Sequence, residues 1–200
     1  MNSRQRGFTL IEVMVALAIV ALMVLVSLPS MTAYFQNAKL GSAAQTFAAG
    51  LQVARAEAIR RNAQIEFMLT DTAIAPATIA NTAVPSATGR NWVVRACDPT
   101  TCTLIEAKSV LEGSGQISGS TPAITVVGTA TSGPSFAGSV FFNGFGATTA
   151  PGDIQLAVNN PAGGQCAPTG PMRCLNVRAA PGGQVRVCDP LAGLGDSRAC

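Results

Sequence analysis

The sequence predicts an α+β protein in which one long N-terminal α-helix packs on an antiparallel β-sheet head. An apolar stretch at residues 8–28 runs into a segment of helical periodicity that extends to about residue 62, which indicates one long helix. Past Leu69 the chain becomes rich in Thr, Ala, Gly and Pro and breaks into short alternating segments, a pattern typical of strands joined by long loops. The 200 residues accommodate this helix and one modest domain.

The apolar stretch Phe8–Leu28 carries a single charge, Glu12, and follows Arg4 and Arg6. As a helix it is about 31 Å long, which is enough to cross a bilayer core. Hydropathy therefore predicts a membrane helix with its basic flank on the cytoplasmic side. A cleaved secretory signal is not favoured, because the apolar run is long and continues into a helical pattern. A carboxylate in such a helix is costly, so Glu12 either has a functional partner or reaches water at the lipid interface.

Residues 29–62 continue the helix as an amphipathic segment that ends near Asn62. Pro29 is expected to kink or loosen the helix, since proline removes one backbone donor. Gly41 and Gly50 each weaken the helix by up to about 1 kcal/mol relative to alanine, so this half needs a sheet to pack against. One apolar stripe supplies that contact: Leu40, Ala44, Phe47, Leu51, Ala54 and Ala58.

The head, residues 63–200, contains eight segments with strand character. They are Gln64–Leu69, Asn91–Ala96, Thr103–Leu111, Ala123–Gly128, Ser139–Phe142, Ile154–Val158, Arg173–Ala179 and Gln184–Cys188. The first alternates and is expected to be half-buried, with Glu66 and Met68 on its outer face. Residues 71–90, 113–122 and 159–171 are expected to be loops, and Trp92 a core residue. Asn143-Gly144 is a strong hairpin signal.

Six cysteines in this head predict disulfides in an oxidising compartment. Many pairings are possible, and the simplest joins neighbours across short loops that carry turn residues. That set is Cys97–Cys102, Cys166–Cys174 and Cys188–Cys200. The gaps of four, seven and eleven residues do not fit zinc spacing, and the chain has no histidine.

Signals for catalysis are nearly absent. Without histidine, Ser-His and Cys-His nucleophilic sites are excluded. The carboxylates are scattered, and no glycine-rich nucleotide-binding pattern follows a strand into a helix. We therefore expect no enzymatic activity, no cofactor and no metal.

The residues G-F-T-L-I-E at positions 7–12, after a basic leader and before an apolar helix, resemble the class III signal of type IV pilins and pseudopilins. The resemblance implies that residues 1–7 are a leader, which prepilin peptidase removes between Gly7 and Phe8. It also implies that the new amine of Phe8 is methylated, and that Glu12 pairs with the N-terminal amine of a neighbouring subunit during assembly. Such a pairing has a physical reason, because a buried carboxylate and a buried ammonium are each costly when alone.

The run L-Q-x-A-R-x-E-A from Leu51, and S-V-F-F-N-G-F-G at residues 139–146, resemble the FimT/FimU/GspH branch of this family. The resemblance implies a minor pilin that primes or builds a type IV pilus, with a pilin-like fold. It would sit in the inner membrane as a single-pass protein with a periplasmic head, and then enter the pilus. The implied partners are other major and minor pilins, prepilin peptidase and the inner-membrane assembly platform. The alternative is the H-type pseudopilin of type II secretion.

The tail carries four arginines, Arg173, Arg178, Arg186 and Arg198, against two aspartates. Arginine forks suit phosphate oxygens. Some FimT-like minor pilins are implied to bind double-stranded DNA through a G-R-x-R motif, and the matching residues 183–186 have Gln184 in place of the first arginine. One cation fewer weakens the electrostatic attraction. Two interpretations stay open here: contact with DNA for natural transformation, or a solvated hairpin whose arginines keep the head soluble.

Overall fold

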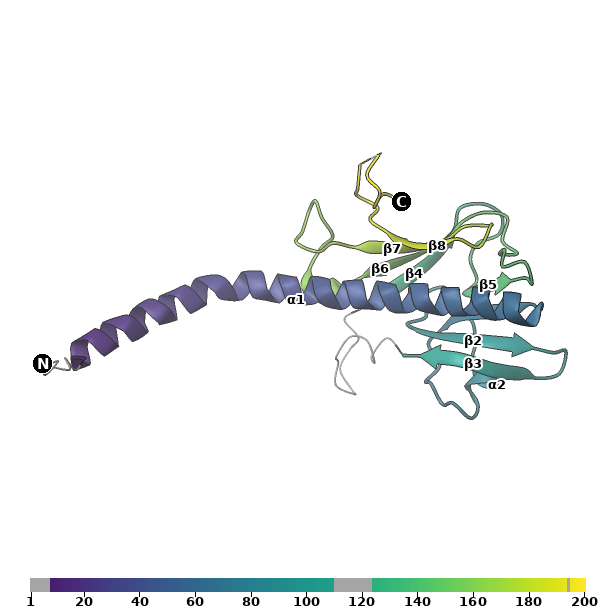
Figure 1. Ribbon diagram of the computed structural model, residues 1–200, viewed down its shortest axis with the longest axis horizontal. Coiled ribbons are helices and arrows are strands. Elements are labelled where there is room, and N and C mark those ends of the chain that lie inside the picture. Colours follow the sequence, from purple (N-terminus) through teal and green to yellow (C-terminus); the bar gives the residue numbers. More distant parts are fainter. Residues whose placement is uncertain (1–7, 110–123, 194) are drawn as a thin grey trace, which may run out of the picture.

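The computed structural model describes residues 8–109, 124–193 and 195–200, without the side chains of residues 24–30 and 162. The expected leader 1–7, the expected loop 113–122 and residues 110, 111 and 123 of two expected strands lie outside the described residues. Figure 1 shows one long helix whose first half projects from the head and whose second half lies along it.

The long helix α1 spans Leu10–Arg61, 52 residues in one element. The side chain of Thr9 caps its start by accepting a hydrogen bond from the Glu12 main-chain N–H at 3.3 Å. Asn62 ends the helix in the left-handed region, with φ of 48°, and its N–H donates to carbonyl oxygens of the last turn. The predicted end near Asn62 is confirmed. The helix is continuous through the position of Pro29.

The described residues of the head form two antiparallel sheets of four strands each, where one sheet was expected. The first has the order β3-β2-β1-β5: β3 (Cys102–Lys108), β2 (Asn91–Cys97), β1 (Ile65–Thr70) and β5 (Ser139–Phe142). The second has the order β4-β6-β7-β8: β4 (Thr125–Ala130), β6 (Ile154–Asn159), β7 (Leu175–Ala179) and β8 (Val185–Cys188). All eight expected strands are present within a few residues of their predicted bounds, and the α+β class is confirmed.

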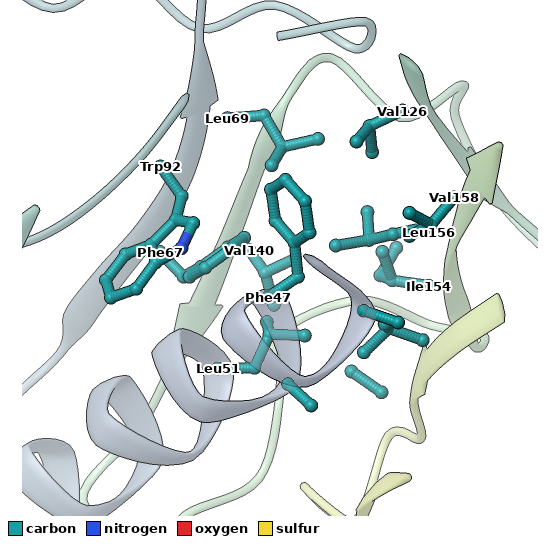
Figure 2. Close-up of a cluster of buried hydrophobic side chains, with 14 of the residues drawn as sticks. Phe47, Leu51, Phe67, Leu69, Trp92, Val126, Val140, Ile154, Leu156 and Val158 are labelled. Atoms are coloured by element: carbon teal, nitrogen blue, oxygen red, sulfur yellow. The ribbon is translucent and has the colours of Figure 1, made fainter. Parts of the chain in front are cut away.

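The core lies between α1 and the two sheets (Figure 2). Phe47 and Leu51 point from α1 into the space between Phe67 and Trp92 of the first sheet and Leu156 of the second. The rings of Phe67 and Trp92 stack with centroids 6.0 Å apart. The predicted burial of Trp92 and of the helix stripe is confirmed, because both sheets need this one helix to cover their inner faces.

The prediction of a half-buried β1 is wrong, because every residue of β1 is buried. The segment expected to be only a loop contains the short helix α2 (Ile79–Thr82), whose Ile79 packs on Met68 and Val93 behind the sheet. Glu66 on the same face is also buried. Its carboxylate accepts hydrogen bonds from Arg95 Nε at 2.7 Å and from the Ser139 hydroxyl at 2.6 Å.

The turn expected at Asn143-Gly144 forms, and across it Phe142 and Thr148 pair in a single antiparallel bridge, which is shorter than a hairpin of two strands. The side-chain oxygen of Asn143 accepts from the main-chain N–H groups of Phe145 and Ala147. β5 pairs with β1, whereas the next strand, β6, lies in the other sheet. The turn packs closely against the end of α1. A Cβ added to Gly144 would lie only 2.3 Å from the side-chain oxygen of Asn62.

Candidate functional site

In the projecting half of α1 and the two residues before it, the described side chains of residues 8–23 and 31–35 expose an unusual amount of apolar surface. Phe8, Leu10 and Tyr34 are 83%, 78% and 72% exposed, and the first helix residue buried by the head is Leu40. Exposed apolar surface of this extent marks a contact with another protein or with lipid. Among the residues whose side chains are described, no helix is both long and apolar enough to cross a membrane. The membrane span expected at residues 8–28 stays a prediction.

Glu12 lies in the first turn of this projecting half. Its position suits the positive end of the helix dipole, which favours an acid in the first turn. Its side chain is exposed, and no basic group of the described residues forms an ion pair with it. The carboxylate is thus available to a group from outside the chain, and its pairing with a neighbouring amine stays a prediction. Gly7 of the expected cleavage site lies outside the described residues, while Phe8 is exposed next to it in sequence.

A set of amide contacts marks the point where α1 leaves the head. The Asn37 side chain donates to the Pro171 carbonyl at 3.1 Å and accepts from the Arg173 N–H at 2.7 Å. The Asn160 side chain donates to Gln36 Oε1 at 2.8 Å. These contacts hold a loop of the head against the helix. The adjacent amide side chains of Gln36 and Asn37, just before the apolar stripe, are a visible sign of a polar contact at this point, but the sequence analysis did not predict it.

The three expected local disulfides are present: Cys97–Cys102, Cys166–Cys174 and Cys188–Cys200. The first closes the β2–β3 hairpin. The second closes the loop that contacts α1. The third ties the tail of the chain back to the end of β8. The pairing of neighbours follows from the hairpins and turns, which bring each pair of Cα atoms within reach.

The last hairpin brings Arg178 and Arg186 face to face, as expected. They are directly paired across β7 and β8, and they share the face of the sheet opposite the buried side chains of Val177 and Ala179. With Gln184 they line a hollow of about 180 Å³. These three sequence-predicted residues therefore form one polar site, which we call the arginine pair with its hollow.

The arginine pair already has partners within the chain, which the sequence did not reveal. Arg178 Nη1 and Arg186 Nη2 both donate to the main-chain oxygen of Cys200, each at 3.0 Å. Arg178 also forms an ion pair with Asp153 at the start of β6. Asp153 is 25 residues away in sequence, and only the pairing of β6 with β7 brings it close.

The other two candidate arginines lie outside the hollow and also contact acids. Arg173 lies 3.8 Å from Asp189, with its side chain 62% exposed. Arg198 forms a two-point hydrogen bond with Asp196, and this bond lowers the pKa of Asp196 to about 2. The four arginines thus do not form one open cluster. Among the described residues, no group of acids, cysteines and histidines is arranged to hold a metal ion.

Two family models match the chain. A model of the prokaryotic N-terminal methylation motif matches residues 2–28, and a model of the type II transport protein GspH matches residues 43–199. No curated protein matches the chain. The Pseudomonas aeruginosa type IV minor pilin FimU is similar in structure at 13% identity and a TM-score of 0.49, over 74% of this chain and 90% of that chain.

The minor pseudopilin EpsH from the type 2 secretion system of Vibrio cholerae is also similar, at 13% identity and a TM-score of 0.46, over 78% of this chain and 99% of that chain. The two family models fall on the two parts of the structure: one on the projecting half of α1, the other on the head with the helix half that it buries. The second model covers well over half of the residues. The chain belongs to the family of the type II transport protein GspH.

Proposed function

We propose that this chain is a structural subunit, a minor pilin or pseudopilin, that assembles through the projecting half of α1. The observation that carries the proposal is the exposed apolar surface of residues 8–23 and 31–35, with one acid, Glu12, in the first turn of the helix. Such a surface is stable only when lipid or neighbouring apolar helices cover it. Before assembly the cover would be the inner membrane, with the head in the periplasm. In the fibre it would be the helices of other major and minor pilins.

Processing would prepare the chain for this assembly. Prepilin peptidase would cut between Gly7 and Phe8, remove the leader and methylate the new amine, and the inner-membrane platform would then add the subunit. Glu12 would neutralise the N-terminal amine of a neighbour. Inside a bundle of apolar helices an unpaired charge costs several kcal/mol, so this contact would select subunits that are in register.

A variant of Glu12 tests the proposal. We expect Glu12→Leu in the full chain to lower recovery in the sheared fibre fraction on the order of a hundredfold, because the neighbour's amine loses its partner. Membrane-fraction levels should be unchanged. Glu57→Gln, an acid on the same helix but beside the head, is the matched control and should assemble normally. Equal recovery of Glu12→Leu and wild type would remove the role assigned to Glu12.

The pilus and the secretion system are distinguished by deletion of the gene. We propose that the chain is a subunit of a type IV pilus, because its tail carries several arginines. The alternative is that it is the H-type pseudopilin of type II secretion. Loss of surface pili with normal protein secretion supports the first. Loss of secretion with normal pili supports the second.

Contact with double-stranded DNA is a second candidate function, favoured by the facing positions of Arg178 and Arg186 on one side of the last hairpin. Two guanidinium groups on directly paired residues can both contact the phosphate backbone of DNA. The test is a DNA titration of the full chain in detergent micelles at two salt concentrations. Salt-sensitive binding that is lost in Arg178→Ala/Arg186→Ala supports DNA uptake, and no binding at low salt leaves a purely structural subunit.

A further inference from the structure

The described residues of the tail, 189–193 and 195–200, lie over the same face of β7 and β8 that carries the arginine pair. Cys188 lies two residues after Arg186 in β8, and residues two apart in a strand point to the same face of the sheet. The Cys188–Cys200 disulfide therefore brings Cys200 onto that face. In Figure 1 the C-terminal end lies above β7 and β8, on the side away from α1.

The main-chain oxygen of Cys200 uses the donors that an external anion needs. It accepts from Arg178 Nη1 and from Arg186 Nη2, and it thereby bridges the two guanidinium groups. The other terminal nitrogen of Arg178 is engaged by Asp153. A phosphate oxygen that takes the bridging position between these two nitrogens must displace the Cys200 oxygen.

The tail keeps its own fold beside this contact. The Asp189 N–H donates to the Arg198 carbonyl at 2.7 Å, and the Ala199 N–H donates to the Asp196 carbonyl at 3.0 Å. Together with the disulfide, these bonds hold Cys200 close to the arginines. A tethered group of this kind acts at an effective concentration of order millimolar, so even a weak contact is populated.

We propose that residues 189–200 are a built-in competitor for the phosphate backbone of DNA at the arginine pair, and that the Cys188–Cys200 disulfide determines how strongly they compete. The inference rests on the second candidate function, since it takes DNA as the ligand. Two solvent-accessible hydrogen bonds keep the site closed about nine-tenths of the time, which weakens the apparent affinity about tenfold. The hollow beside Gln184 is the place where the displacing phosphate enters.

The first test compares DNA binding by disulfide variants of the full chain in detergent micelles. We expect Cys188→Ser/Cys200→Ser to bind a labelled duplex about tenfold more tightly than wild type. The matched control is Cys97→Ser/Cys102→Ser, which opens the disulfide of another hairpin and should leave affinity unchanged. Adding Arg178→Ala/Arg186→Ala to the open-tail variant should remove the gain. Equal affinity of the open-tail variant and wild type overturns the competition and leaves DNA binding in place.

The second test needs no cysteine substitution and so does not depend on the folding of the open-tail variant. Duplex DNA added to wild type should speed hydrogen exchange at the tail amides Asp189 and Ala199, because the ligand displaces the tail. Exchange at the β2–β3 hairpin should stay the same. Binding without faster tail exchange overturns the competition. A third outcome is that no variant binds DNA, while the Arg178→Ala/Arg186→Ala substitutions by themselves speed hydrogen exchange in the tail. The arginines would then only anchor the tail, and the DNA-binding function would be ruled out as well.

Discussion

Two glycines of α1, Gly41 and Gly50, should respond to alanine in opposite directions. Helix propensity alone predicts that each substitution stabilises the helix by about 0.5–1 kcal/mol. At Gly41 nothing lies within 4 Å of an added Cβ, so the gain should be observed. At Gly50 the added Cβ would lie 2.9 Å from the ring of Phe67 and 2.9 Å from the indole of Trp92.

The contact at Gly50 is with rigid, buried groups. Phe67 is fully buried, Trp92 is 1% exposed, and their rings are stacked on each other, so neither has space to withdraw. Overpacking a core of this kind costs about 1–3 kcal/mol. Since the propensity gain is common to both variants, Gly50→Ala should be less stable than Gly41→Ala by that amount.

The assay is thermal unfolding of the full chain in detergent micelles, followed by far-ultraviolet circular dichroism and by Trp92 fluorescence. For a domain of this size the difference corresponds to a Tm about 2–12 °C lower in Gly50→Ala than in Gly41→Ala. A Gly50→Ala protein that is stabilised as much as Gly41→Ala would refute the reasoning. In that case the helix would not pack as closely on the first sheet as the structure shows.

Three further predictions concern the head. Gly183→Ala should lower the free energy of unfolding by more than about 1 kcal/mol. Gly183 has φ of 79°, and an added Cβ would lie 1.7 Å from a main-chain oxygen of the facing turn. Urea titration checks this prediction, with Gly182→Ala as the control. Glu66→Ala should cost about 3 kcal/mol, since it removes the ion-pair partner of Arg95, whose side chain is only 13% exposed, and the same titration measures the loss. Hydrogen bonds from two arginines lower the pKa of Glu57 from 4.5 to about 2, so its stabilising contribution is complete above about pH 4.5 and is lost as pH falls toward 2; melting curves against pH should show this, and Glu57→Gln should remove it.

Specific outcomes would contradict these predictions. Gly182 has no atom within 4 Å of an added Cβ, so equal losses in Gly182→Ala and Gly183→Ala would rule out the steric cause. A Glu66→Ala loss that is no larger than that of an exposed ion pair would mean that Arg95 reaches water when it is alone. Melting curves of wild type and Glu57→Gln that fall in parallel below pH 4.5 would mean that other carboxyl groups cause the acid sensitivity.

Most of the secondary structure followed from local patterns, and the errors share one cause. Strand positions were predictable because apolar alternation and turn residues are local signals. The full burial of β1 was not, because it depends on α2, a four-residue helix whose segment looks like a low-complexity loop. The division into two sheets depends on which edges pair, and that choice is made by contacts between residues far apart in sequence.

The candidate sites divide in the same way. The pairing of the six cysteines was predictable, since their short spacings are visible in the sequence. The roles of Phe8 and Glu12, which depend on a motif and on a lone charge in an apolar run, stay predictions. The pairing of Arg178 with Arg186 followed from one glycine turn. Their engagement by Asp153 and by the Cys200 oxygen did not, because a partner that arrives from another strand or from a disulfide-tied tail leaves no local pattern.

The sequence by itself determined the long helix, its capped end, the strands and the family of the chain, because each depends on residues within a few positions of one another. Only the tertiary structure decided where α1 leaves the head, which glycine has no space for a methyl group and which arginines are already occupied. These properties arise from distances between segments that the chain brings together after it folds. They depend on packing, which periodicity and composition do not encode.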